Sequence, residues 1–341
     1  MIGTVDLQDA VSGYLDLAAV GHAAAAVRLA LGLLDQGATS EAVIVDLLSA
    51  AQCETGERWL RNEWTVADEH LVSGVTQRAL DAVANTIDQP SYAPSVVVAC
   101  AEGDWHSLPA QMGAELLRAR GIVVSFLGAS TPADHVARLL SRDKPDAMMI
   151  TCNLPLFFAG VIRLTDAAHR AGVPVMAGGR SVPSLQRALS LGADSWAPDI
   201  SSAALQIPDL RCPPSPNPNP GRPNSAALLL DVDSARLASQ AFDSLIAAHP
   251  FMCSFNDDQL TRTKEDLAFI VRFVAAAAIV GDSTVLTEFL GWLKSLLIAR
   301  SVPPGAILAG LEVLVPLITN VDGAAGQLAL HAAEHLSAAP R

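Results

Sequence analysis

The sequence predicts a multidomain protein of the α and α/β classes, in which a doubly wound parallel-sheet domain lies between two all-helical regions. Three observations support this prediction. Apolar residues recur at helical spacing before residue 90 and again after residue 225. Between these regions, short apolar runs rich in β-branched residues alternate with segments of helix length, which is typical of parallel sheets. Seven prolines within residues 206–224 indicate a linker before the last helical region.

The composition argues against nucleic acid as a ligand. The 341 residues are enough for several domains; 51% are apolar and only 17% are charged, against a usual ~25%. The formal net charge is −13, and Lys and Arg form no run. A protein that neutralises nucleic-acid phosphates needs a basic face, so we expect no direct DNA binding.

The cysteines, the N-terminus and the apolar segments indicate the cellular compartment of the protein. Five cysteines are dispersed without a Cys-x-x-Cys pair, which favours a reducing environment over a disulfide framework. The N-terminus is acidic and shows no secretory signal. The most apolar stretch, 267–281, contains Arg272 and is too short to cross a bilayer. We therefore expect a cytoplasmic protein that does not act at a membrane.

Residues 1–90 are predicted to form a four-helix bundle. The first apolar run reaches Gly37, a residue suited to a helix C-cap, and a second helix extends to about Ala51. A third segment spans about residues 57–87. Short amphipathic helices of this kind bury their apolar faces by packing as an antiparallel bundle.

Residues 91–205 are predicted to form the parallel sheet. Helix-length segments separate four apolar runs, which read VVVACA, VVSFLG, AMMITC and VPVMAGG. In doubly wound sheets, ligands bind at the carboxyl ends of the strands. We therefore expect the chemistry of this protein to lie directly after these four runs.

After the linker at 206–224, residues 225–341 are predicted to form a separate all-helical domain. Pro, Gly and Asp-Ser signals separate its segments. These segments lie near 226–248, 257–280, 283–300, 304–319 and 323–337. The pattern does not specify which all-α fold they adopt.

The loop after the first predicted strand contains Asp104-Trp105-His106-Ser107. A carboxylate beside an imidazole can accept the hydrogen of one ring nitrogen and leave the other nitrogen free to bind a metal. Taken alone, an Asp-x-His pair is more often an ordinary pair of loop residues. Its position at the end of a strand favours a ligand site.

The motifs at three strand ends resemble the cobalamin-binding domain of the methionine synthase and mutase type. That family carries Asp-x-His-x-x-Gly, then a Ser-x-Leu-like strand end, then Gly-Gly. The corresponding residues here are Asp104, Trp105, His106, Ser107, Thr151, Asn153, Gly178 and Gly179. Two positions depart from the family: Pro109 replaces its glycine, and Asn153 replaces its Leu or Thr. The first affects the path of the loop beneath the corrin, and the second affects the lining of the nucleotide slot.

The resemblance implies a base-off cobalamin in which His106 replaces the cofactor's own dimethylbenzimidazole as the axial ligand to cobalt. Asp104 would polarise this imidazole. The displaced nucleotide tail would enter a slot along the sheet, where Thr151, Gly178 and Gly179 let the backbone approach it closely. For the two glycines, the alternative is an ordinary turn between a strand and a helix.

The spacing of Trp59, Glu69 and His70 resembles the cap bundle of light-sensing cobalamin repressors of the CarH kind. In that family, the bundle covers the upper corrin face and encloses the 5′-deoxyadenosyl group of adenosylcobalamin. The resemblance implies that Trp59 packs against this group and that Glu69 and His70 contact it or respond when it leaves. The alternative is a core tryptophan near a solvated Glu-His pair.

The order of cap, cobalamin domain, linker and helical domain resembles the photocobilins, whose last domain is globin-like or phycocyanin-like and binds a bilin such as biliverdin. A bilin needs an apolar slot, cations for its propionates and a polar group near its pyrrole nitrogens. The candidate residues are Arg262, Asp266, Phe269 and Phe273 on one predicted helix, with Phe289 and Trp292 on the next. The alternative is that these aromatic residues are core and the charges are solvated.

Other candidates in the last domain are weaker. Cys253 could form a thioether to a tetrapyrrole, with an inert buried thiol as the alternative. His331 and His335 have the spacing of metal ligands, but an alanine-rich terminal helix favours surface positions for them. His249 is followed by proline and does not suggest a haem ligand.

These interpretations favour a photoreceptor that binds adenosylcobalamin and a bilin and catalyses no turnover. It would signal by a photolysis-driven change of conformation or oligomeric state. We expect a homo-oligomer, with a dimer favoured, and a signalling partner protein that the sequence does not identify. One alternative is a corrinoid methyl carrier for a methyltransferase system, and another is a cobalamin sensor without photochemistry. The Trp59 to Glu69-His70 spacing favours the photoreceptor.

Overall fold

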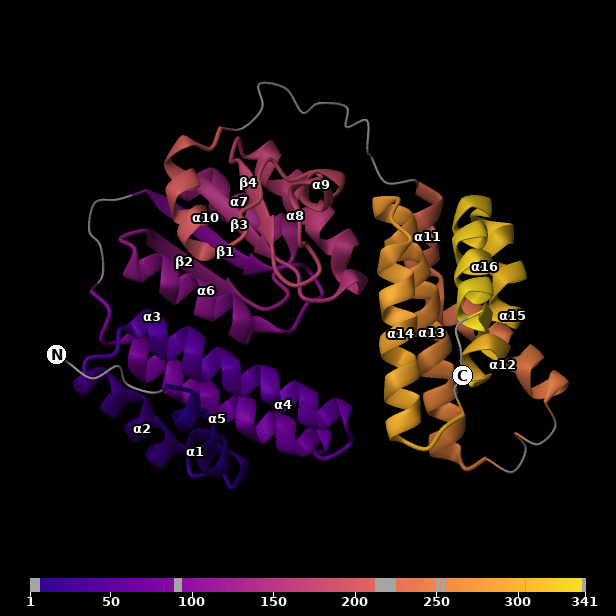
Figure 1. Cartoon of the computed structure of the whole chain (residues 1–341). Helices are drawn as coiled ribbons and strands as arrows, with labels where there is room; N and C mark the ends of the chain where they lie inside the picture. The colour runs from indigo at the N-terminus through magenta and orange to yellow at the C-terminus, as the bar shows by residue number, and fades with distance from the viewer. Residues whose placement is uncertain are drawn as a thin grey trace.

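The computed structural model of the protein describes residues 7–88, 94–211, 225–249, 252, 255–303 and 305–338. Figure 1 shows three bodies: a helical bundle, a sheet covered by helices, and a second helical body at the C-terminal end. This arrangement confirms the predicted combination of α and α/β classes. None of the described helices is long and apolar enough to cross a membrane.

The N-terminal bundle consists of helices packed around one apolar core. Its elements are α1 (Leu7–Ala19), α2 (Ala23–Asp35), α3 (Ser40–Ala42), the π-helical η1 (Val43–Ser49), α4 (Ala50–Leu60) and α5 (Val66–Ala84). α3, η1 and α4 follow one another without a break and form one long helix. The largest fully buried side chains of this core are Tyr14, Leu15, Ile44, Leu47, Leu48 and Leu80.

Two turns divide the bundle where the apolar periodicity predicts continuous segments. Gly21, with a φ of 72°, separates α1 from α2 within the first apolar run. Asn62, with a φ of 60°, lies in the turn between α4 and α5, and Thr65 then starts α5 with a capping box. The prediction of one segment over 57–87 is therefore wrong, because a left-handed residue ends the first helix.

The central sheet has four parallel strands among the described residues, in the order β2-β1-β3-β4. The strands are β1 (Ser95–Cys100), β2 (Val123–Gly128), β3 (Ala147–Thr151) and β4 (Val175–Gly178), which coincide with the four predicted runs. Cys100 pairs with Thr151, and Thr151 pairs with Gly178. Three strands therefore end at one level, where the sequence places its candidate site.

Helices cover both faces of the sheet, as a doubly wound fold requires. They are α6 (Ser107–Ala119), α7 (Ala133–Asp143), α8 (Phe158–Arg170), α9 (Leu185–Ser190) and α10 (Ile200–Gln206), with the 3-10 turns η2 (Pro155–Phe157) and η3 (Ile207–Asp209). Alternate strand residues point to opposite faces. Val97 and Ile150 pack with α7 and α8, whereas Val98 and Met149 pack with α6 and α10. α6 also contributes to the core of the bundle, so the first two bodies share an interface.

The C-terminal body is helical throughout its described residues. Its elements are α11 (Ser225–Val232), α12 (Ser234–Ala248), α13 (Asp257–Val280), α14 (Thr284–Ala299), α15 (Gly305–Val321) and α16 (Gly323–Ala338). The predicted segment at 226–248 is two helices that meet at Asp233. α13 begins with a capping box at Asn256 and ends at Gly281, whose φ of 65° suits glycine. A globin-like or phycocyanin-like fold for this body stays a prediction.

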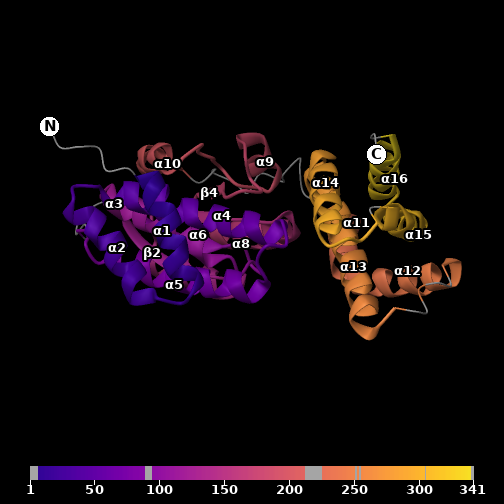
Figure 2. The same cartoon turned by 60° about the horizontal axis from the view of Figure 1, so that its bottom comes forward.

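The C-terminal body contacts both other bodies, and Figure 2 shows it beside them rather than stacked on them. Arg187 forms an ion pair with Asp282 at 2.5 Å, and Arg272 donates to the carbonyl oxygen of Leu156 at 3.0 Å. The apolar core of this body is continuous with the core on one face of the sheet. α14 also contacts α4 of the bundle. All three bodies are therefore in mutual contact.

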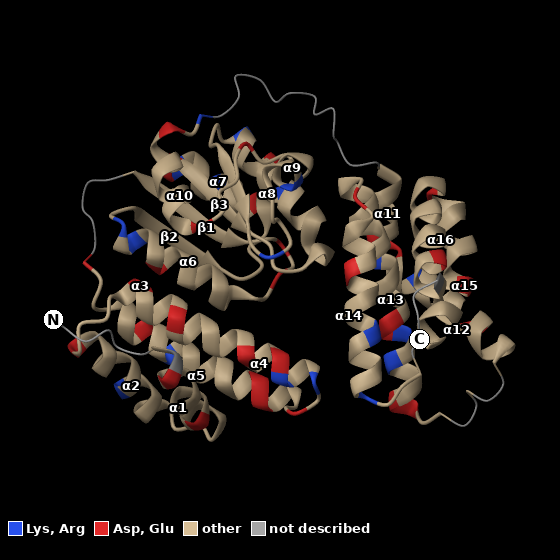
Figure 3. Ribbon diagram, in the orientation of Figure 1, with Lys and Arg blue, Asp and Glu red and all other residues tan. Residues whose placement is uncertain are grey.

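Charged residues are distributed over all three bodies. In the view of Figure 3, Lys and Arg residues are dispersed among Asp and Glu residues and do not gather on one face. The lack of direct DNA binding stays a prediction.

Candidate functional site

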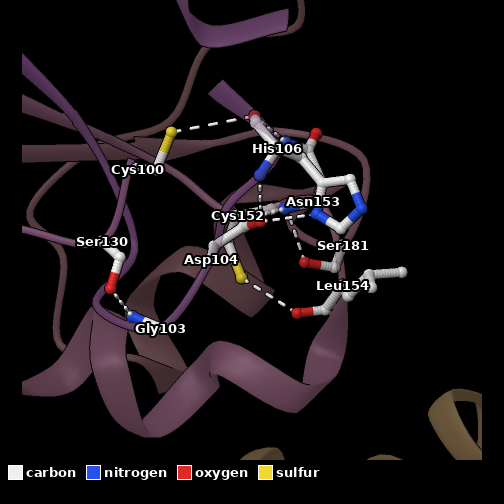
Figure 4. A network of polar contacts seen from close by, with 9 residues as sticks. All are labelled: Cys100, Gly103, Asp104, His106, Ser130, Cys152, Asn153, Leu154 and Ser181. Atoms are coloured by element: carbon white, nitrogen blue, oxygen red, sulfur yellow. Dashed lines mark hydrogen bonds and ion pairs between the residues drawn. The ribbon is translucent and has the colours of Figure 1, made fainter. Parts of the chain in front are cut away.

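The loop between β1 and α6 holds a buried carboxylate against an imidazole. Asp104 has no exposed surface, whereas the side chain of His106 is 54% exposed. Oδ1 of Asp104 accepts hydrogen bonds from the backbone N–H of His106 at 3.0 Å and from its Nδ1 at 2.7 Å. Figure 4 shows one ring nitrogen of His106 joined to Asp104 and the other pointing away from it. A neutral imidazole that donates from Nδ1 to this carboxylate keeps a lone pair on Nε2 with which it can bind a metal.

The electrostatics of this pair fit a metal ligand and its orienting partner. Burial alone would raise the pKa of Asp104, but hydrogen bonds from His106 and Asn153 lower it below its usual range. The hydrogen bond to Asp104 raises the pKa of His106 against the opposing effect of burial. The charge of Glu69 also raises the pKa of His106. Glu69 on the cap bundle therefore lies within electrostatic range of the imidazole.

Two further residues hold the loop in place, and sequence reasoning missed both roles. Asn153 was expected to line the nucleotide slot, yet its backbone N–H donates to Oδ2 of Asp104 at 3.0 Å and its Nδ2 donates to the carbonyl oxygen of His106 at 3.2 Å. Ser130, after β2, donates from its N–H to the carbonyl oxygen of Asp104, and its Oγ accepts from the N–H of Gly103, both at 3.0 Å. Ser130 has a φ of 44°, a left-handed conformation that a sequence pattern does not reveal for serine.

The remaining predicted residues of this loop take different positions. Trp105 precedes His106 in the sequence, and its side chain is 75% exposed. Among the described residues, no hydrogen bond or ring contact of its indole is found. Ser107 is half-buried and starts α6. Trp105 therefore offers an exposed aromatic surface on the same loop as His106.

The ends of β3 and β4 form a second part of the site. The Thr151 hydroxyl is buried without a conventional hydrogen bond among the described residues and lies near the Cys100 thiol. A Cβ added to Gly179, whose φ is 97°, would lie 2.5 Å from the carbonyl oxygen of Cys152. A Cβ added to Gly178 would meet no atom within 4 Å. Gly179 is thus required for close packing of two backbones, whereas Gly178 borders open space.

These features fit a corrinoid with a displaced nucleotide tail. A free imidazole nitrogen suits cobalt, which nitrogen ligands bind well. The open space at Gly178 lies at the end of β4, next to Thr151 at the end of β3, so an extended group would find room at these neighbouring strand ends. The residues present are therefore compatible with the predicted cofactor.

The cap residues lie on both sides of the α4–α5 turn. Trp59 is half-buried near the end of α4, and Glu69 and His70 lie in the first turns of α5. Oε2 of Glu69 is 2.5 Å from Nδ1 of His70, whose side chain is 74% exposed. The predicted alternative of a Trp59 buried in the bundle core is wrong. Its ring instead stacks on Trp292 of α14, with 6.2 Å between ring centroids.

Arg300, at the end of α14, completes this contact between bodies. Its guanidinium lies 5.0 Å from the centroid of the Trp59 ring, and its Nη2 donates to the Trp59 carbonyl oxygen at 3.5 Å. Desolvation by burial and the charge of Arg262 lower the pKa of Arg300. Sequence reasoning missed Arg300, because only the packing of α14 against α4 brings it to the cap.

The structure separates the predicted bilin residues into buried and accessible ones. Phe273 and Phe289 are buried and stacked at 3.7 Å between ring centroids, and Phe289 is 6.0 Å from Trp292. Phe269 and Trp292 stay 42% and 40% exposed. Arg262 is exposed and Asp266 is half-buried. His331 and His335 are exposed, as expected, and Cys253 lies outside the described residues.

The carboxylate of Asp104 is expected to be essential to both fold and ligand. Asp104→Asn keeps the size but turns an amide N–H₂ toward backbone donors, which should destabilise the protein by about 1–3 kcal/mol. Loss of the Nδ1–H acceptor should weaken cobalamin binding by roughly 10- to 100-fold. Denaturant unfolding and a spectroscopic cobalamin titration measure the two effects.

Asp146→Asn is the matched control for this substitution. Its carboxylate likewise accepts a backbone N–H, from Ser95 at 2.7 Å, but at the opposite end of the sheet. Equal cobalamin affinities in the two variants would contradict the assigned role of Asp104.

Comparison with known families identifies two segments of the chain. Residues 94–204 match the family model described as B12 binding domain, and residues 12–84 match a second model with the same description. The first covers the parallel sheet with its helices, and the second covers the bundle. The bundle and the sheet domain therefore both match B12-binding domains.

Two curated relatives are similar over this part of the chain. The HTH-type transcriptional repressor CarH of Myxococcus xanthus is 30% identical over 145 residues, which are 41% of this chain and 48% of the relative. The HTH-type transcriptional repressor CarA of the same organism is 32% identical over 133 residues, 38% of this chain and 46% of the relative. The chain thus spans about half the length of the curated relatives it matches.

A solved structure supports the fold. The monomethylamine corrinoid protein of Methanosarcina barkeri superposes with a TM-score of 0.52 at 19% identity, covering 60% of this chain and 99% of that protein. At this identity, the similarity shows the fold alone. The two domain matches lead to one conclusion: the chain contains two B12-binding domains, which are similar to the matched part of CarH.

Proposed function

We propose that the chain is a light-responsive regulator that binds adenosylcobalamin, with His106 as the axial ligand to cobalt. One observation carries this proposal. The His106 imidazole is oriented by a fully buried carboxylate, and its free nitrogen lies within electrostatic range of Glu69 on the cap bundle. His106 and Glu69 would hold a corrin between the sheet domain and the cap bundle. The similarity to CarH over the same two domains supports this arrangement.

Each residue of the site has a separate task in this proposal. Asp104 keeps a hydrogen on Nδ1 of His106 and leaves Nε2 for cobalt. Thr151 and Gly178 provide the polar group and the space for the nucleotide tail. Adenosylcobalamin, when bound, supplies a cobalt–carbon bond that light breaks. Trp59 and Glu69 would enclose its upper group, and no residue is assigned to turnover.

The contact of Trp59 with α14 offers a route for the signal. Trp59 stacks on Trp292, and Arg300 both covers its ring and binds its carbonyl oxygen. A displacement of Trp59 at the cap would therefore alter the packing of the C-terminal body. We propose that this change is transmitted as a new conformation or oligomeric state, with a dimer as the starting assembly and a partner protein as the receiver.

The C-terminal body is proposed to bind a bilin such as biliverdin on the accessible side of α13 and α14. Phe269 and Trp292 supply exposed aromatic surface there, and Arg262 supplies a cation for a propionate. Burial raises the pKa of Asp266 to about 6, so its carboxyl is poised between the neutral and charged forms near the pyrrole nitrogens of such a ligand.

Reconstitution in the dark tests the proposal. The protein is mixed with adenosylcobalamin or methylcobalamin, with and without biliverdin, and absorption spectra and molar mass are recorded before and after green and red light. We expect an irreversible change of the adenosylcobalamin spectrum on illumination, accompanied by a change in conformation or mass. Transfer of a methyl group from methylcobalamin to a methyltransferase, with no light-dependent change, would instead identify the protein as a corrinoid methyl carrier. A bound corrin with no light response and no methyl transfer would identify it as a cobalamin sensor without photochemistry.

Trp59→Ala removes an aromatic contact worth about 0.5–1.5 kcal/mol. We therefore expect the adenosylcobalamin affinity or the photolysis rate to change at least about threefold. The absorption spectrum of cobalamin ligated by His106 should stay the same. Trp64→Ala is the matched control, because Trp64 is also half-buried near the α4–α5 turn and also carries an arginine over its ring, at 4.9 Å. Equal adenosylcobalamin affinities and photolysis rates in the two variants would show that Trp59 has only a structural role.

Asp266 should give the C-terminal body a pH-dependent stability. Its pKa is about 6 in the folded chain against 3.8 normally, so folding favours the protonated form. Stability is then highest below about pH 4 and falls as the pH rises toward 6. Asp266→Asn should therefore stabilise the protein by about 1–2 kcal/mol at pH 8, after allowance for partial exposure, and by less at pH 5.5. Denaturant unfolding at both pH values measures this, with the exposed Asp243→Asn as control.

A further inference from the structure

A chain of hydrogen bonds runs from the cap surface at Glu69 into the centre of the bundle. The Ser73 hydroxyl lies 2.8 Å from Oε1 of Glu69 and 2.9 Å from Oε1 of Gln52. Nε2 of Gln52 donates to the Thr76 hydroxyl at 3.0 Å, and the Tyr14 hydroxyl donates to the same oxygen at 3.1 Å. These five residues come from α1, α4 and α5, so the chain crosses the whole bundle.

The inner half of the chain lies in an apolar core. Tyr14 and Thr76 have no exposed surface, and leucine, isoleucine and valine side chains make up the core around them. Burying two hydroxyls there costs free energy unless each finds a partner, so their mutual hydrogen bond is strongly constrained. Burial raises the pKa of Tyr14 to about 12, although its hydrogen bond with Thr76 opposes this. Tyr14 therefore stays a hydrogen-bond donor at every working pH.

The outer half of the chain offers a choice between two acceptors. A serine hydroxyl carries one hydrogen, yet Ser73 lies within hydrogen-bond distance of acceptors on both Glu69 and Gln52. Gln52 is fixed because its Nε2 is engaged by Thr76. The competition therefore depends on Glu69, whose other oxygen is already paired with His70 at 2.5 Å. A carboxylate oxygen can accept more than one hydrogen bond, so Glu69 can keep its contact with Ser73 while it accepts from a ligand group.

We propose that four positioning residues hold the Glu69 carboxylate toward the upper side of the cobalamin site: Tyr14, Gln52, Ser73 and Thr76. Through this carboxylate, the cap distinguishes upper ligands by their hydrogen-bond donors. An upper group rich in hydroxyl and amino donors, such as a nucleoside, satisfies the fixed carboxylate. A methyl group has no hydrogen-bond donor, and a hydroxo group has only one. This inference rests on the proposed binding of cobalamin between His106 and the cap.

The chain offers a closely matched pair of substitutions as a test. Thr76→Val removes the hydroxyl that joins Tyr14 to Gln52 and keeps the shape of the side chain. Thr55→Val is the control, because Thr55 is also buried in the bundle but donates only to the carbonyl oxygen of Ala51 in its own helix, at 2.7 Å. Thr76→Ser restores the hydroxyl. Ser73→Ala, at a half-buried position, tests the outer link if Thr76→Val does not fold.

The measurement is the ratio of the dissociation constants for hydroxocobalamin and adenosylcobalamin in the dark. We expect the ratio to fall about 5- to 10-fold in Thr76→Val and Ser73→Ala, with the hydroxocobalamin affinity unchanged, since one hydrogen bond to a charged group is weakened. The ratio of the two dissociation constants should be unchanged in Thr55→Val and restored to the wild-type value in Thr76→Ser. Equal ratios in Thr76→Val and Thr55→Val, or a wild-type protein that does not favour adenosylcobalamin, would overturn the positioning role. Failure of the wild type to bind either corrinoid would instead refute the proposed function.

Discussion

Replacing His106 with alanine is expected to lower the affinity for cobalamin by about 100-fold or more, because loss of an outer partner of a metal ligand alone typically costs 10- to 100-fold. Any corrinoid that still binds should show the spectrum of a base-off form with water below the cobalt. The imidazole is 54% exposed and its Nε2 carries no structural hydrogen bond among the described residues, so the fold should persist. A spectroscopic titration in the dark measures both affinity and ligation.

Two controls separate ligation from general damage at the surface. His331→Ala removes an exposed imidazole of α16, in the C-terminal body, whose Nδ1 lies 4.0 Å from Glu334, and this variant should bind cobalamin normally. Free imidazole added to the His106→Ala protein should restore the nitrogen-ligated spectrum. A bound spectrum that is the same in His106→Ala and in the wild type would show that another group binds cobalt.

Gly179→Ala is expected to destabilise the protein by about 3 kcal/mol. The added Cβ would lie 2.5 Å from the carbonyl oxygen of Cys152, and the φ of 97° is unfavourable for any side chain. Overpacking costs about 1–3 kcal/mol and a left-handed backbone about 1–2 kcal/mol per residue. Because Cys152 and Asn153 follow β3 directly, relief of the clash should also displace the backbone that binds Asp104 and weaken cobalamin binding.

Gly178→Ala provides the comparison within the same motif. Its added Cβ meets no atom within 4 Å, so we expect the free energy of unfolding to stay within about 0.5 kcal/mol of the wild type. A loss of cobalamin affinity without loss of stability in this variant would then report directly on the nucleotide slot. Equal stabilities of the two alanine variants in denaturant unfolding would contradict the close packing assigned to Gly179.

Local sequence patterns were sufficient for the fold class. The four strands coincide with the four apolar runs because strands of a buried parallel sheet need continuous apolar residues. The helix breaks at Gly21, Asn62 and Asp233 were not predicted. Apolar periodicity continues across a tight turn, so the left-handed residues Gly21 and Asn62 leave no trace in it, and neither does the break at Asp233, whose φ is −84°.

The candidate site could be located from the sequence but not built from it. The order of strand ends predicted that Asp104, His106, Thr151 and Gly178 would gather at one edge, and the paired strands bring them there. The bracing of the loop by Ser130 and by the backbone of Asn153 was not visible. A backbone N–H donates whatever its side chain is, so such contacts leave no residue signature.

By itself, the sequence determined the alternation of strands and helices, the apolar faces and the positions of chemically distinctive residues, since these depend on spacing of a few residues along the chain. Only the tertiary structure decided that Asp104 fixes the free nitrogen of His106, that Trp59 stacks on Trp292, and that Tyr14 is linked to Glu69. The stacked tryptophans are far apart in the sequence, and Tyr14 and Thr76 are 62 positions apart. Such contacts depend on how whole helices pack, because the free energy of burying a polar or aromatic group is set by its neighbours in space rather than in sequence.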